Sequence, residues 1–292
     1  MWNIGNIRID RVVEFAQPLL AASVLLPDSS KERIDFHRHW LQPNLMDPET
    51  GDLVIAFHSF VIRSKNCVIV VDTCSGNDRE RPQKPRYHHK QWPYLQNLAA
   101  SRIRPEEVTH VLCTHLHVDH VGWNTQLVDG KWVPTFPNAK YLFSRKEYEF
   151  WSGQFATGAF KGDPYYLDCI TPIFDAGLSQ LVDMDFELDE GVRLIPSPGH
   201  TPGHVCVLIS SGDQSAIMSG DIMHHPIQCA EPEWNSCFCV EQDLARKTRI
   251  DFLSRYADTS TLVMPAHFPT PSVGQIVPWD SGFHFTAYPR RR

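Results

Sequence analysis

The segment Cys113-Thr114-His115-Leu116-His117-Val118-Asp119-His120-Val121-Gly122 places four potential metal ligands within six residues. It follows an apolar stretch, 109–113, that we expect to be a strand, and loops at strand ends commonly carry functional side chains. His115 and His117 are two residues apart, so both point to the same side while the chain is extended. Once the chain turns, Asp119 and His120 can face a second point nearby. The segment therefore predicts a metal site.

The composition agrees with a histidine-rich, soluble globular protein. The chain has 292 residues, 42% of them hydrophobic, and contains 15 histidines, which are the commonest metal ligands in proteins. Its 27 basic and 34 acidic residues give a net charge of −7. Proteins that follow a nucleic-acid backbone usually carry the opposite charge, so we expect no nucleic-acid partner.

The chain carries no sign of export or membrane insertion. Its first ten residues lack the basic and apolar regions of a signal peptide, and no apolar run approaches the length of a membrane span. The eight cysteines are scattered and form no C-x-x-C pair, which is typical of free thiols in a reducing compartment. We therefore expect a cytoplasmic protein without a membrane partner.

Hydrophobic patterns predict strands alternating with helices over a single domain, 1–292. Residues 16–50 show no regular pattern, and we expect an N-terminal arm there that covers the site or forms a homodimer contact. The basic end, 290–292, should be a solvated tail. Strands are expected at 4–15, 53–62, 67–71, 109–113, 138–143, 192–195, 204–210, 216–219 and 262–264, and helices at 94–100, 145–151 and 241–256.

The H-x-H-x-D-H segment after a strand resembles the signature of the metallo-β-lactamase superfamily. Later motifs occur in the order that this family shows, namely Pro198-Gly199-His200-Thr201-Pro202-Gly203-His204, then Ser219-Gly220-Asp221, then Met264-Pro265-Ala266-His267. The resemblance implies an α/β fold of the αββα sandwich type, with two mixed sheets flanked by helices.

The resemblance also implies a ligand set for two divalent metal ions. One ion would be held by His115, His117 and His200, the second by Asp119, His120 and His267, and Asp221 would bridge both. Zinc is the first choice, and manganese, iron or cobalt suit the same ligands. Asp72 matches the aspartate that the family places behind the histidine loop, although a simple strand-end cap is the alternative. His204 could orient the His200 loop or be an ordinary buried histidine.

His224 bears on the substrate. The acyl-homoserine lactonases that resemble this chain commonly have a tyrosine there that contacts the substrate carbonyl. The histidine is more similar to the methyl-parathion-hydrolase branch, so we expect His224 to face the substrate or to support the metal ligands. The aromatic segment 151–166 could line an apolar pocket, or belong to the core or a dimer face.

These features predict a dinuclear metal-dependent hydrolase. A metal-bridging hydroxide would open a small ester, most plausibly a lactone, and Asp119 or Asp221 could help to move the proton. A phosphotriester or aryl-ester hydrolase is the alternative. A dimetal oxidoreductase is less favoured, because His117 stands where the redox branch has glutamate. The natural substrate is left open.

Overall fold

The computed structural model describes residues 1–287, so the predicted tail at 290–292 lies outside the described part of the chain. The chain forms two compact units. The first unit contains Met1–Phe15 and Phe57–Glu190, and the second contains 16–56 and the residues from 191 onward. Within residues 1–287, no helix is both long and apolar enough to cross a bilayer.

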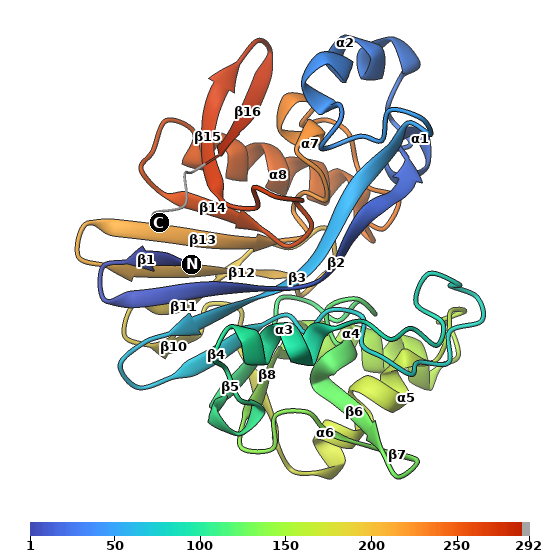
Figure 1. Cartoon of the computed structure of the whole chain (residues 1–292), viewed down its shortest axis with the longest axis vertical. Coiled ribbons are helices and arrows are strands. Elements are labelled where there is room, and N and C mark those ends of the chain that lie inside the picture. The colour runs from blue at the N-terminus through green and yellow to red at the C-terminus, as the bar shows by residue number, and fades with distance from the viewer. Residues whose placement is uncertain (288–292) are drawn as a thin grey trace. The chain divides into compact units, whose positions relative to one another are not determined.

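The first of two seven-stranded mixed sheets has the order β1-β2-β3-β4-β5-β8-β9. Its strands β4, β5, β8 and β9 are parallel, and β4, β5 and β8 lie side by side in Figure 1. Because parallel strands end at one edge, the loops after β4 and β5 begin next to each other. The strands are β1 (Trp2–Ile4), β2 (Ile7–Ala21), β3 (Asp52–Arg63), β4 (Val68–Val71), β5 (His110–Cys113), β8 (Lys140–Ser144) and β9 (Ser179–Val182).

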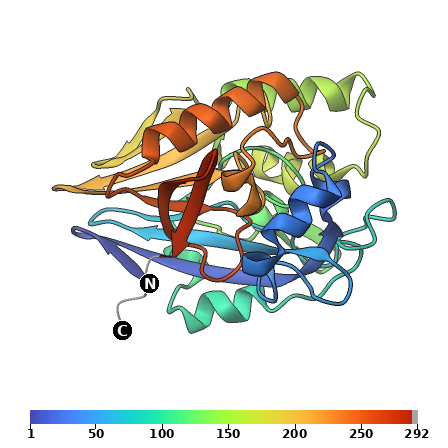
Figure 2. The same cartoon turned by 90° about the horizontal axis from the view of Figure 1, so that it is seen from above.

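The second sheet has the order β10-β11-β12-β13-β14-β15-β16. Strands β13 and β14 are parallel, and both end in loops that carry predicted ligands. Figure 2 shows α8 (Gln242–Tyr256) running along this sheet, where its Phe252 and Leu253 join the core. The strands are β10 (Glu187–Asp189), β11 (Val192–Pro196), β12 (Val205–Ser211), β13 (Gln214–Gly220), β14 (Leu262–Pro265), β15 (Gly274–Trp279) and β16 (Gly282–Ala287).

The segment 16–50 is more regular than its sequence suggests. Strand β2 continues to Ala21, and two helices follow, α1 (Ala22–Leu25) and α2 (Lys31–Leu41). The side chain of Ser30 accepts a hydrogen bond from the backbone of Arg33 and so caps α2. The prediction of an irregular segment there was therefore wrong in part. The residues that α2 buries include His37, whereas its Phe36 is exposed, so apolar residues do not mark the packed face of this helix.

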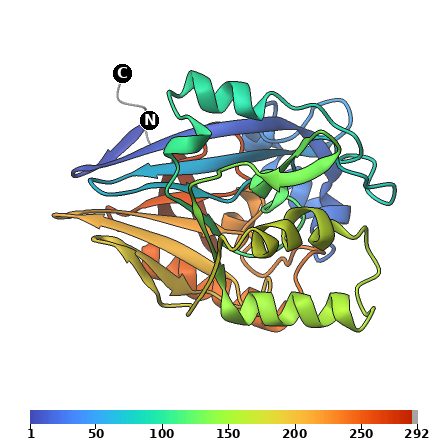
Figure 3. The same cartoon turned by 90° about the horizontal axis from the view of Figure 1, so that it is seen from below.

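The remaining elements complete the α/β architecture, and the predicted fold class with two mixed sheets and helices is confirmed. The predicted helix at 145–151 extends to residue 156, and Figure 3 shows it beside α5, where the rings of Phe155 and Tyr166 are 4.8 Å apart. The further elements are α3 (Tyr94–Ala100), α4 (Arg145–Ala156), α5 (Tyr165–Cys169), α6 (Thr171–Asp175), α7 (Ile227–Ala230), the 3-10 turns η1 (Pro105–Glu107) and η2 (Gly122–Asn124), and the hairpin β6 (Thr125–Val128) and β7 (Lys131–Pro134).

Candidate metal centre

In the first unit, the loop after β5 gathers three histidine rings. Nε2 of His115 lies 3.1 Å from Nδ1 of His117, and the ring centroids of His115 and His120 are 4.0 Å apart. His115 and His120 are buried, whereas His117 and Asp119 are half-buried. The loop therefore concentrates imidazole nitrogens, with a carboxylate between them in sequence.

Asp72, directly after β4, holds this loop from behind. Its Oδ1 accepts a hydrogen bond of 2.7 Å from the backbone of Thr114, and its Oδ2 lies 2.9 Å from Nδ1 of His120. A carboxylate beside Nδ1 favours the tautomer that leaves Nε2 of His120 to bind a metal. The predicted role for Asp72 behind the histidine loop agrees with these contacts. Its φ of 56° lies in the left-handed region, which aspartate adopts more readily than most non-glycine residues.

Two buried residues that the sequence did not single out as supports also fix the loop. Glu147 of α4 accepts hydrogen bonds from the backbone of Leu116, at 3.0 Å, and from the indole of Trp151, at 2.7 Å. The hydroxyl of Tyr165 donates to the carbonyl of Leu116 at 2.7 Å. Trp151 and Tyr165 are buried, so these two members of the aromatic segment belong to the core. A lone glutamate in an amphipathic helix offers no motif by which its role could be found.

Glu14 and Gly122 tie the end of the loop to the segment after β4. The carboxylate of Glu14 accepts from the backbones of Ser75 and Gly76 and, at 2.7 Å, from the indole of Trp123. Burial raises the pKa of Glu14 above its usual value. A Cβ on Gly122 would lie 2.0 Å from the carbonyl carbon of Ser75, so only glycine fits there.

Tyr87 contacts the carboxylate of the loop. Its hydroxyl donates to Oδ2 of Asp119 at 3.4 Å, and its ring packs edge-on against Phe57. Burial raises the pKa of Tyr87 well above its usual value, so the phenol stays protonated and remains a donor. Tyr87 lies in the long loop before α3, where the sequence shows no motif, and sequence reasoning missed it.

In the second unit, Asp221 is the centre of the predicted ligands. It follows β13, and its Oδ2 lies 3.4 Å from Nε2 of His200 and 3.2 Å from Nε2 of His224. Its Oδ1 lies 3.2 Å from Nε2 of His267. All four side chains are buried. The structure thus brings together three histidines from three separate loops around one carboxylate.

Hydrogen-bond partners decide which ring nitrogen carries the proton in two histidines of this unit. Nδ1 of His267 lies 3.0 Å from the carbonyl of Ala56, which can only accept a hydrogen bond, so Nδ1 carries the proton and Nε2 keeps its lone pair. Nε2 of His204 accepts a bond of 3.0 Å from the backbone of Asp221. His204 therefore positions Asp221, and its Nδ1 also lies 2.8 Å from Oγ of Ser197, three residues before His200. The sequence left open whether His204 orients the His200 loop or is an ordinary buried histidine.

The His200 loop is held against α8. Gly199 has a φ of 131°, and a Cβ there would lie 2.4 Å from the backbone nitrogen of Ala245. The carbonyls of Gly199 and His200 accept from the backbones of Glu241 and Val240, and the hydroxyl of Thr248 donates to Pro198. These contacts aim the imidazole of His200 at Asp221.

The donors suit a divalent transition metal. In each unit the candidate ligands offer imidazole nitrogens and a carboxylate, which are the ligands that zinc, manganese, iron and cobalt share. The carbonyl beside Nδ1 of His267 and the carboxylate beside Nδ1 of His120 both favour a proton on Nδ1, which leaves the Nε2 lone pair of each ring for a metal ion. The buried carboxylate of Asp221 is costly without a cation, and a metal ion would offset that cost.

Comparisons with known proteins agree with this picture. Residues 58–267 match the family model described as the metallo-beta-lactamase superfamily. An N-acyl homoserine lactonase of Bacillus sp is 30% identical over 114 residues, which is 39% of this chain and 38% of that enzyme, so the match spans well under half of that relative. A metallo-beta-lactamase domain-containing protein 1 of Xenopus laevis is 25% identical over 75% of this chain and 74% of its own length.

Two solved structures show the same fold over the whole chain. The hydrolase AbOPH, described as a member of the beta lactamase superfamily, aligns with a TM-score of 0.82 at 22% identity, covering 100% of this chain and 97% of its own. AidC, a dizinc quorum-quenching lactonase, aligns with a TM-score of 0.77 at 22% identity and the same coverage. With a family model that matches most of its length, the chain belongs to the metallo-beta-lactamase superfamily.

Proposed function

We propose that this protein is a dinuclear metal-dependent hydrolase that opens a small, largely uncharged ester, with a lactone as the first choice. The observation that carries the proposal is the set of seven potential ligands with their supporting contacts. His115, His117 and His200 would hold one ion, Asp119, His120 and His267 the other, and Asp221 both. When bound, zinc or similar ions supply a hydroxide at neutral pH and polarise the carbonyl under attack.

The chain's own residues would position the substrate and move the proton. His224 lies 3.2 Å from Asp221 and can face the reacting group. The ring of Phe238 lies 6.0 Å from that of His224, and Phe238 is 44% exposed, which suits contact with the apolar part of an ester. Tyr87, a protonated donor to Asp119, would hold that carboxylate in place. Asp119 or Asp221 would then shuttle the proton.

A phosphotriester or aryl-ester hydrolase is the second candidate, favoured by a histidine at position 224. The relatives include N-acyl homoserine lactonases, which favours the lactone as substrate. We also propose that the protein forms a homodimer through the segment 16–50, because the apolar side chains of Val24 and Phe36 in this segment are 52% and 50% exposed. A dimetal oxidoreductase would instead require iron and a visible absorption spectrum.

The test is a panel of lactone, phosphotriester and nitrophenyl-ester substrates, run on purified protein whose metal content is measured by elemental analysis. His117→Ala and Asp221→Ala should reduce both turnover and bound metal to background. The controls His39→Ala and Asp213→Ala change exposed residues of the same types and should match the wild type. Wild-type turnover and metal content in the two ligand variants would refute the site.

A further inference from the structure

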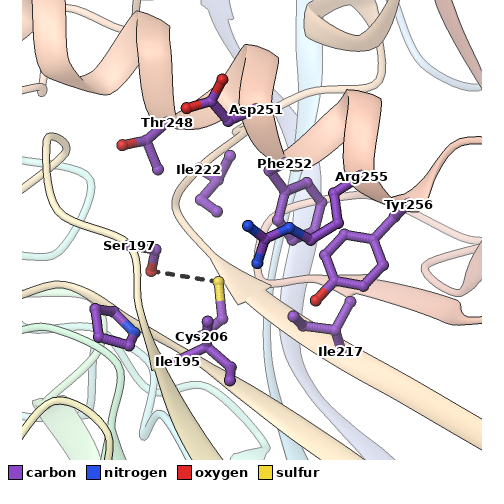
Figure 4. Close-up of a pocket in the computed structure, with 11 residues that line it drawn as sticks. Ile195, Ser197, Cys206, Ile217, Ile222, Thr248, Asp251, Phe252, Arg255 and Tyr256 are labelled. Atoms are coloured by element: carbon purple, nitrogen blue, oxygen red, sulfur yellow. Dashed lines mark hydrogen bonds between the residues drawn. The ribbon is translucent and has the colours of Figure 1, made fainter.

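A cavity of about 150 Å³ lies within the second unit, between α8 and the second sheet. Figure 4 shows its walls. Ile195 and Ile217 come from the sheet, Ile222 from the loop after β13, and Phe252 and Tyr256 from α8. Its walls therefore combine these apolar side chains with the polar groups of Ser197, Thr248 and Arg255.

One edge of the cavity is positively charged. Figure 4 shows the guanidinium of Arg255 reaching over the cavity beside Tyr256. The carboxylate of Asp251 points away from the cavity in Figure 4 and pairs with Lys247 at 2.6 Å. The charge facing an occupant is therefore that of arginine, which binds carboxylates well.

The floor of the cavity is linked to Asp221. The thiol of Cys206 donates to Oγ of Ser197 at 3.3 Å, the bond drawn in Figure 4. Oγ of Ser197 lies 2.8 Å from Nδ1 of His204. Because Nε2 of His204 accepts from the backbone of Asp221, Nδ1 carries the proton and donates it toward Ser197. A short hydrogen-bonded chain thus joins the cavity to the central carboxylate.

We propose that this cavity binds a small monocarboxylate with an apolar body the size of a benzene ring, and that the occupant acts on Asp221 through Ser197 and His204. A cavity of this volume has room for a group the size of a benzene ring, and its isoleucines and Phe252 offer that group an apolar wall. Arg255 would pair with the carboxylate while Phe252 and the isoleucines surround the ring. Binding stands on the cavity alone, whereas its effect on turnover rests on the proposed hydrolase function.

The binding test is a calorimetric titration of the metal-loaded protein with benzoate. We expect one saturable site, affinity at least tenfold weaker in Arg255→Gln, and weaker binding of the neutral analogue benzamide. Arg246→Gln removes the same charge from α8 outside the cavity and should bind benzoate like the wild type. The absence of saturable binding, or equal affinity in Arg255→Gln, would overturn the proposal.

The carboxylate of benzoate can also bind metal ions directly, so a second measurement distinguishes binding in the cavity from binding at the metal ions. If the cavity is the site, Asp221→Asn retains benzoate binding, and benzoate changes kcat with a hydrolysed substrate in the wild type but not in Arg255→Gln. Loss of binding in Asp221→Asn with simple competition against substrate would place benzoate at the metal ions and refute the proposal. If the protein hydrolysed none of the substrates, the titrations would still decide whether the cavity binds.

Discussion

The two sets of candidate ligands are supported by different chemistry. In the first unit, three buried carboxylates, Asp72, Glu147 and Glu14, accept hydrogen bonds from backbone N–H groups in and around one continuous loop. In the second unit, imidazole nitrogens accept the hydrogen bonds from backbone N–H groups instead. His204 accepts from the backbone of Asp221, and Nδ1 of His225 accepts from the backbone of Ile227 while its Nε2 lies 2.9 Å from the carbonyl of Leu45.

The difference follows from how the ligands are arranged along the chain. One continuous loop has several N–H groups close together, and a carboxylate with two oxygens can accept several of them at once. The second set comes from three loops, so its supports must connect one backbone to another. An imidazole with one donor and one acceptor nitrogen does this, but only while it is neutral.

The largest effect on stability should come from filling the space at the two glycines beside the ligands. In Gly122→Ala, the new methyl group would overlap Ser75 of a neighbouring loop, and we expect a loss of about 3 kcal/mol in the free energy of unfolding. Gly199→Ala should also destabilise, because Gly199 has a positive φ and lies against Ala245. Denaturant unfolding measures both.

The control for these variants is Gly153→Ala in α4. Nothing lies within 4 Å of a Cβ there, and alanine favours a helix, so stability should be unchanged or slightly raised. If Gly122→Ala were as stable as this control, the close approach of the two loops in the first unit would be wrong.

Mild acid should weaken the second unit through His225. Burial lowers the pKa of His225 from 6.5 to about 4. Between these values the unfolded chain binds a proton that the folded chain does not, so stability falls as the pH falls through this window. The loss should reach about 3 kcal/mol, at about 1.4 kcal/mol for each pKa unit.

The measurement is the free energy of unfolding against pH, for the wild type, His225→Gln and the exposed control His39→Gln. His225→Gln should be less stable at pH 7, because a buried ring is lost, but should show a shallower decline between pH 6.5 and 4. Parallel curves for all three proteins would mean that His225 does not titrate as its burial implies.

The contrast between the units also explains what sequence could predict. Residue chemistry alone pointed to four candidate ligands that lie within six residues, namely His115, His117, Asp119 and His120. The other three, His200, Asp221 and His267, were found only through a family resemblance. Helix α8 was predicted to within one residue, because its 15 residues contain no glycine or proline and include several strong helix formers. Glu147 and Tyr87 were missed because a buried polar contact depends on tertiary packing, and no local pattern encodes it.

The smallest effect should come from weakening one support in each unit without removing a ligand. In the first unit, Asp72→Asn keeps the shape but removes the charge beside Nδ1 of His120, so metal affinity should fall about 10- to 100-fold. In the second unit, His204→Gln should cost less, because the bond from Asp221 to His204 comes from the backbone of Asp221, and glutamine can still accept that N–H.

Competition with a chromophoric chelator measures metal affinity in both variants. Asp10→Asn, which changes another buried carboxylate of the first unit that pairs with Arg8, serves as the control and should bind metal like the wild type. A larger loss in His204→Gln than in Asp72→Asn would reverse the comparison. Placement of Asp221 would then limit metal binding, and the three separate loops of the second unit, rather than the continuous loop of the first, would determine the affinity of the site.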